Sequence, residues 1–212
     1  RLVGSEMCIR DRHTMERYFT PTDTDTSLTD RIAEGLMVSV RDAAKIAVKE
    51  PENYEARATL MWAGSLSHNG LTGAGRVSDF ATHKIEHELG GMFDVAHGAG
   101  LAAVWGSWAR YVYKTNPGRF VQFGEKVFDM HIPESANTVP SIETAALFAI
   151  SAWENWCHSI GMPITLTELS IHPTDAQIEE MAEKCVFGRN GHIGFFQPLT
   201  KEDIVAILQM AK

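Results

Sequence analysis

Apolar side chains recur at intervals of three or four residues along most of this chain, whereas alternating strand patterns are nearly absent. Between residues 28 and 48, for example, Ile32, Leu36 and Val40 fall on one face of a helix. Pro51 ends that stretch, because proline lacks the backbone N–H that a helix needs. Further helices are expected at 52–71, 99–113, 120–128, 141–160, 174–185 and 201–211. The pattern predicts an all-α fold, a multi-helix bundle.

Two details of these helices concern the interior and the helix ends. The run at 52–71 carries Tyr54, Met61 and Trp62 and is expected to be well buried. The helix at 141–160 is followed by Gly161 and Pro163, which is a common way for a helix to end. The tryptophans are expected to pack in the core, and contact with a substrate is the alternative for some of them.

Composition and charge narrow the classes of partner. The net charge is −8, so neither a nucleic acid nor an anionic membrane surface is expected, since both call for a basic face. The longest apolar run, 144–153, is about half the length of a membrane span. The three cysteines form no C-x-x-C pair, and no signal peptide is recognisable. A reduced, cytoplasmic protein is expected.

The first residues look foreign to the rest of the chain. Residues 6–12 read Glu-Met-Cys-Ile-Arg-Asp-Arg, which resembles the translation of a transposon adapter used in sequencing libraries. We therefore predict that residues 1–12 are a non-native segment, with a genuine basic arm as the alternative. Residues 13–212 are then expected to form one helical, metal-binding and catalytic domain, and the chain is expected to be a fragment.

The strongest chemical signal is a histidine block at residues 82–98. His83 and His87 are four residues apart, so on a helix they share one face. Gly90-Gly91 is expected to interrupt this helix and let the chain turn back, which brings His97 beside them. Imidazoles that converge from two helices are typical ligands of a divalent first-row metal. The spacing therefore predicts a metal site.

With the histidines placed, the chain resembles the C-terminal helical domain of the iron-containing alcohol dehydrogenases of the butanol-dehydrogenase type. Three segments carry the resemblance: residues 13–18, residues 50–71, and the block at 73–98 with its H-x3-H-x9-H spacing. The resemblance implies the dehydroquinate synthase-like fold of that domain. It also implies that the family's N-terminal NAD(P)-binding domain lies outside this chain, so no cofactor-binding residue is assigned.

The resemblance also implies roles for particular residues. In the family an aspartate and three histidines hold one divalent metal, usually Fe2+ and sometimes Zn2+. His13, His83 and His97 match the three histidine ligands, and His87 matches a histidine near the nicotinamide and substrate that helps proton movement. The family aspartate, four residues before the first histidine, corresponds to Ile9. The fourth, carboxylate ligand is therefore missing from the predicted site.

The implied activity is hydride transfer between a short primary alcohol or aldehyde and NAD(P)H, in a protein that is a homodimer at full length. The 212-residue chain itself is expected to have little activity, because the nucleotide domain and the carboxylate ligand are missing. The sequence leaves open NAD versus NADP, the metal and the substrate.

Three other readings compete with this one. A glycerol-dehydrogenase-like polyol oxidoreductase is the nearest, and a helical metallohydrolase would need a carboxylate beside the histidines, for which Asp94 is the evident aspartate. A helical scaffold that binds metal adventitiously is the third. Glu86 and Glu88 are expected on a solvated face or behind the metal ligands. The remaining histidines are expected to be ordinary: His68, His131, His158, His172 and His192.

Overall fold

The computed structural model describes residues 12–132 and 139–212, and within these ranges the chain is helical with one isolated antiparallel bridge between Ile193 and Leu199. A first helical segment covers residues 12–18. The α-helices that follow are α2 (Ser27–Lys49), α3 (Tyr54–His68), α4 (Ala81–Phe93), α5 (His97–Val112), α6 (Pro117–Phe128), α7 (Val139–Ser159), α8 (Asp175–Val186) and α9 (Lys201–Met210). The all-α prediction is confirmed, and residues 1–11 lie outside the described part.

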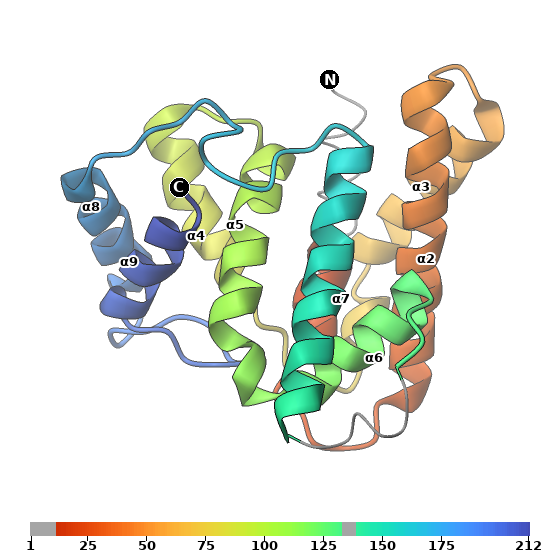
Figure 1. Ribbon diagram of the computed structural model, residues 1–212, viewed down its shortest axis with the longest axis horizontal. Coiled ribbons are helices and arrows are strands. Elements are labelled where there is room, and N and C mark those ends of the chain that lie inside the picture. Colours follow the sequence, from red (N-terminus) through yellow and green to blue (C-terminus); the bar gives the residue numbers. More distant parts are fainter. Residues whose placement is uncertain (1–11, 133–138) are drawn as a thin grey trace.

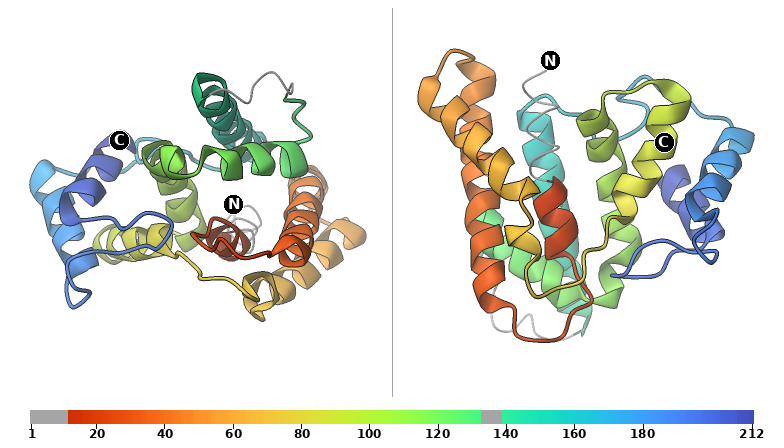
Figure 2. Two further views of the ribbon diagram at one scale, coloured as in Figure 1. Left: turned by 90° about the horizontal axis from the view of Figure 1, so that it is seen from below. Right: turned by 180° about the vertical axis from the view of Figure 1, so that it is seen from behind.

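The helices form a broad bundle (Figure 1). Helices α2 and α3 make an antiparallel pair at one side, α8 and α9 lie at the other, and α5 and α7 stand between them. The segment at residues 12–18 lies near the middle of the molecule, as both views of Figure 2 show. Its Met15 and Tyr18 side chains are fully buried, so this short helix is part of the core.

Side-chain caps explain where several helices begin. Asn53 accepts the Ala56 N–H at the start of α3, and Asn116 accepts the Arg119 N–H at the start of α6. Thr174 and Thr200 each take part in a reciprocal capping box, at α8 and α9. Such caps satisfy N–H groups that have no partner within the helix, and they are visible in the sequence.

The interior is rich in aromatic side chains. Phe19 packs against Phe120 and Trp105 packs against Trp153, with ring centroids 4.6 and 4.5 Å apart. Both tryptophans are about 1% exposed, as expected for core residues. None of the described helices has the length and apolarity required to cross a membrane.

One prediction about the interior is wrong. Tyr54, Met61 and Trp62 on α3 are 77%, 67% and 66% exposed, although the sequence suggested burial. Helix α3 instead buries a narrow face of small residues against α2, including Ala56 and Ala63. The large side chains share the opposite face, because Tyr54 and Met61 are seven residues, about two helical turns, apart.

Candidate metal centre

Three helices bring the predicted histidines together. His13 lies on the first segment, His83 and His87 lie on α4, and His97 is the first residue of α5. The first segment is tied to the start of α4, since the Asp79 N–H donates to the Glu16 carbonyl oxygen at 3.0 Å. The four imidazoles therefore come from parts of the sequence up to 84 residues apart, and tertiary packing assembles them.

The start of α4 is held by a buried carboxylate. Asp79 accepts the N–H of Ala81 at 2.7 Å, and its second oxygen accepts the N–H groups of Phe195 and Phe196 at 3.0 and 2.6 Å. Burial, together with the nearby charge of Glu16, raises the pKa of Asp79 to about 6. This carboxyl group anchors the start of α4 to the loop that precedes α9.

The turn between His87 and His97 differs from the one expected. Helix α4 continues through Gly90-Gly91 and ends at Phe93, so the predicted interruption at the glycines is wrong. The chain reverses at Asp94, whose φ of 52° is left-handed. A glycine pair lowers helix stability by about 1 kcal/mol per residue, which packing of α4 against α5 and α8 overrides here.

The imidazole rings form a contiguous cluster. The ring centroids of His13 and His83 are 4.6 Å apart, and those of His83 and His97 are 5.4 Å apart. His87 is 5.4 Å from His97 and 6.3 Å from His83, and it is the exposed member of the α4 pair. Among the described residues, one set of potential ligand atoms lies mutually within 4.8 Å, that of Glu86, His87 and His97. Of the predicted ligands His13, His83 and His97, this set contains only His97.

His83 is the most deeply placed of these rings. It is 5% exposed, and neither of its ring nitrogens hydrogen-bonds to any of the described residues. Burial, with repulsion from His97, Arg12 and His87, lowers its pKa to about 3. A buried neutral imidazole without a hydrogen-bond partner is costly, and a metal ion is a partner that removes the cost. His83 is therefore suited to hold a divalent ion.

Two buried carboxylates stand beside these rings. The sequence analysis did not place Glu16, and it left Glu86 either on a solvated face or behind the metal ligands. Glu16 has an oxygen 3.3 Å from Nδ1 of His83 and also accepts the Thr82 hydroxyl. Burial raises its pKa to about 7, although the Thr82 hydrogen bond opposes the shift. Glu86 pairs with Nδ1 of His97 and is 2% exposed. For Glu16, its place one helical turn after His13 was an available signal.

His68 also belongs to the cluster, although the sequence interpretation treated it as ordinary. Its ring centroid lies 4.1 Å from that of His13, and its Nδ1 is 2.8 Å from the Gly64 carbonyl oxygen. The spacing of residues in the sequence does not predict this contact, because His68 ends α3 and His13 lies on another helix. Among the other histidines, His158 pairs with Glu168 at 3.1 Å.

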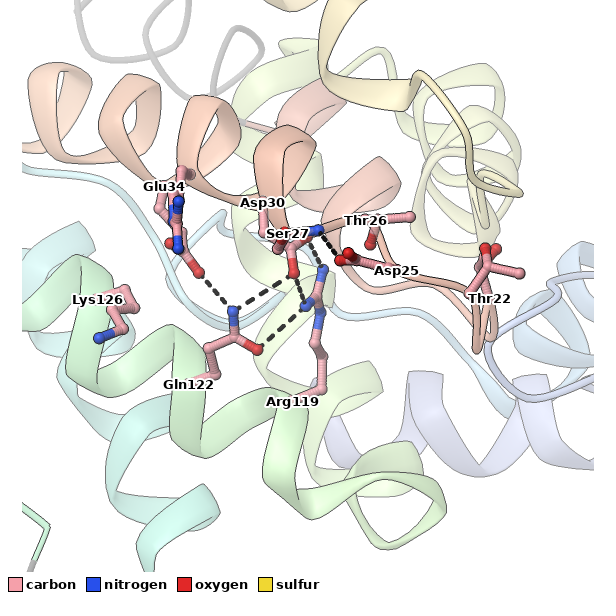
Figure 3. A pocket seen from close by; sticks show the side chains of 11 residues that line it. Thr22, Asp25, Thr26, Ser27, Asp30, Glu34, Arg119, Gln122 and Lys126 are labelled. Atoms are coloured by element: carbon pink, nitrogen blue, oxygen red, sulfur yellow. Dashed lines mark hydrogen bonds and ion pairs between the residues drawn. The ribbon is translucent and has the colours of Figure 1, made fainter.

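A polar hollow lies away from the histidine cluster, between α2, α6 and the loop before α2 (Figure 3). Its volume is about 600 Å³. We call it the polar pocket, and its lining includes Asp30, Glu34, Arg119 and Gln122. Arg119 makes a two-point ion pair with Asp30 at 2.6 Å, and Gln122 donates to Glu34 at 2.7 Å. Because these groups already satisfy one another, the histidine cluster is the better candidate for chemistry.

Comparison with known proteins finds relatives over most of the chain. Residues 12–212 match the sequence profile described as "Fe-containing alcohol dehydrogenase family, C-terminal". The chain is 32% identical over 198 residues to NADH-dependent butanol dehydrogenase A of Clostridium acetobutylicum, covering 93% of this chain and 49% of that protein. It is 34% identical over 159 residues to the NADPH-dependent aldehyde reductase YqhD of Escherichia coli, covering 75% of this chain and 39% of that one.

Solved structures show the same fold. The crystal structure of NADH-dependent butanol dehydrogenase A from Thermotoga maritima superposes with a TM-score of 0.87 at 30% identity, over 98% of this chain and 51% of that one. The substrate- and cofactor-free form of YqhD gives a TM-score of 0.89 at 28% identity, over 100% and 53%. The chain spans about half the length of the curated relatives it matches.

Proposed function

The chain belongs to the iron-containing alcohol dehydrogenase family, and from that membership we propose that it is the metal-binding part of an NAD(P)-linked alcohol dehydrogenase or aldehyde reductase. The named relatives include butanol dehydrogenases that use NADH and an aldehyde reductase that uses NADPH. The proposed substrate is a short primary alcohol or aldehyde. A cytoplasmic homodimer is part of the proposal for the full-length protein.

The proposed metal ligands are His13, His83 and His97. The observation that supports them is His83, whose ring nitrogens are buried and make no hydrogen bond to the described residues. Imidazole nitrogens suit Fe2+ and Zn2+ alike, and we propose Fe2+ as the native ion because of the family. When bound, such an ion supplies Lewis acidity toward the oxygen of an alcohol or aldehyde. Ile9, where the family has its aspartate, lies outside the described residues.

His87 is proposed to carry the proton. It is exposed, lies next to the His97 ring, and sits on the same helix as His83. Imidazole exchanges protons in the physiological pH range, so His87 is suited to accept the hydroxyl proton of an alcohol and to pass it to solvent. The hydride itself moves between the carbinol carbon and the nicotinamide, which the other half of the full-length protein is proposed to bind.

The test joins this chain to the nucleotide-binding half of a relative. This chain is fused to the half of the Clostridium butanol dehydrogenase that it does not match. The fusion, loaded with Fe2+, is expected to oxidise NADH when butanal is added. The His83→Ala fusion is the matched control and is expected to be inactive. The 212-residue chain alone is expected to show little turnover.

Two results would contradict the proposal. One is robust butanal reduction by the 212-residue chain alone. The other is a metal-loaded fusion that leaves butanal untouched and hydrolyses phosphate esters, which would favour the metallohydrolase reading. That reading gains some support from Glu16 and Glu86, which supply the carboxylates near the histidines that it requires.

A further inference from the structure

Glu86 is a charged residue in an unusually enclosed place. It lies on α4, three residues after His83 and one before His87, and it is 2% exposed. Removing a carboxylate from water costs several kcal/mol unless a partner with good geometry compensates for the loss. A buried Glu86 therefore requires a contact that compensates for the lost hydration.

The partner of Glu86 is the first residue of the next helix. Its Oε2 contacts Nδ1 of His97, across the turn that joins α4 to α5. The His97 side chain is about one-third exposed, so the carboxylate approaches it from the protein interior while part of the ring remains open. A carboxylate can only accept at this contact, which places the donated proton on Nδ1.

The space for Glu86 is made by glycine. A Cβ atom at Gly100 would lie 2.6 Å from Oε1 and 2.8 Å from Cγ of Glu86, which is closer than real contacts allow. A Cβ at Gly90 would lie 3.3 Å from the same oxygen. Gly100 is buried within α5, where alanine would otherwise be the better helix former. The missing side chain at position 100 forms a notch that the carboxylate fills.

We propose that Glu86 is a positioning residue for the metal: its carboxylate, seated in the Gly100 notch, holds His97 with the proton on Nδ1 and Nε2 free to bind the ion. This inference rests on the proposed metal site and adds to it a residue that the family resemblance did not assign. A carboxylate behind a metal-binding imidazole selects the tautomer and orients the ring, and it makes the ligand more basic.

The geometry also distinguishes this role from direct ligation. Ligand atoms of Glu86, His87 and His97 lie within 4.8 Å of one another, so Glu86 is near enough to compete as a ligand. To ligate, however, the carboxylate would have to share its charge between the ion and the imidazole that it already contacts. The experiment below separates the two roles.

The experiment titrates the purified 212-residue chain with Co2+, whose visible absorption reports the coordination around the ion. Two variants disturb Glu86 by independent routes: Glu86→Gln removes the charge, and Gly100→Ala fills the notch. Both are expected to bind Co2+ about ten- to hundredfold more weakly than the wild type.

Two control variants make the same chemical changes elsewhere. Glu34→Gln neutralises another buried carboxylate, which accepts from Tyr18 and Gln122 in the polar pocket. Gly91→Ala adds a methyl group on α4 where nothing lies within 4 Å. Both controls are expected to bind Co2+ as the wild type does, and circular dichroism checks that all four variants are folded.

A second readout needs no metal. The ¹⁵N shifts of the His97 ring in the metal-free chain are expected to show a proton on Nδ1, and a mixture of tautomers in Gly100→Ala. A wild-type His97 protonated on Nε2 would overturn the proposal.

The Co2+ titrations distinguish failure of the proposed role of Glu86 from failure of the proposed metal site. Wild-type affinity in both Glu86→Gln and Gly100→Ala would overturn the role of Glu86 and leave the metal site intact. Complete loss of binding in Glu86→Gln, equal to that of His97→Ala, would make Glu86 a ligand and would also overturn the proposal. No Co2+ binding by the wild type would remove the metal site itself, and with it the role of Glu86.

Discussion

Two polar regions of this molecule differ in whether their buried side chains have hydrogen-bond or ion-pair partners. In the polar pocket, Asp30 pairs with Arg119 and Glu34 accepts from Gln122 (Figure 3). Arg76 and Tyr18, beside the pocket, also contact Asp30 and Glu34 respectively. In the histidine cluster, His83 is equally enclosed, yet its ring nitrogens have no hydrogen-bond partner among the described residues. The buried carboxylates of the first region therefore have partners and the buried imidazole of the second does not, although Nε and Nη2 of Arg76 also lack a hydrogen-bond partner among the described residues.

The protonation states differ in the same way. Burial opposes ionisation of Asp30, but the hydrogen bond and charge of Arg119 outweigh it and lower the pKa of that carboxyl. For His83, burial lowers the pKa to about 3 and keeps the ring neutral, as a metal ligand must be. A hollow of about 600 Å³ is therefore a weaker sign of function than a small buried group with an unmet hydrogen-bonding need.

The largest expected effect is on metal retention. Replacing His83 or His97 by alanine is expected to weaken binding of a divalent ion by more than about a hundredfold, since each imidazole supplies one of only a few bonds to the ion. His87→Ala is expected to keep the metal and, in the fused enzyme, to slow turnover. Metal analysis after dialysis measures this, with His158→Ala as the control. Equal metal loss in the His87 variant would refute the assigned roles.

The second prediction concerns stability: a substitution in the polar pocket is expected to lower the free energy of unfolding and to leave the histidine cluster unchanged. Asp30→Ala leaves the fully buried Arg76 side chain and the adjacent Arg119 without their carboxylate. The free energy of unfolding is expected to fall by about 3–5 kcal/mol, while Co2+ affinity stays unchanged. Urea denaturation measures the loss. Asp25→Ala, which lines the same pocket but is exposed, is the control and is expected to change stability by less than about 1 kcal/mol. Equal losses in both variants would contradict the distinction.

The smallest effect concerns pH and the second carboxylate of the cluster. Burial raises the pKa of Glu16 from 4.5 to about 7, so between these values the folded, metal-free chain binds more protons than the unfolded chain. The Glu16 contribution to stability is therefore present at low pH and is lost as the pH rises through 7.

The Glu16→Gln variant cannot titrate at this position. Relative to the wild type, it is expected to gain about 2–3 kcal/mol of unfolding free energy between pH 4.5 and pH 8. Denaturation of both proteins across this range measures the difference, and Glu34→Gln is the matched control. A constant difference between the Glu16 variant and the wild type would show that burial does not shift this carboxyl.

Much of the secondary structure followed from local signals. The helix caps at Thr174 and Thr200 and the end of the long helix near Gly161 act within one turn of chain, so the sequence displays them directly. The interruption at Gly90-Gly91 was predicted wrongly because a helix-weakening pair can be overridden by packing. The exposure of Trp62 was missed for a related reason, since size and apolarity do not say which face of α3 meets a neighbour.

By itself, the sequence determined that this chain is helical, that His83 and His87 share a helix face, and which family it resembles, because periodicity and motif spacing are properties of neighbouring residues. Only the tertiary structure decided that Glu86 lies behind His97, that His68 packs against His13, and that Asp30 is paired with arginine. Those contacts join helices far apart in the chain, and their geometry depends on how the whole bundle packs.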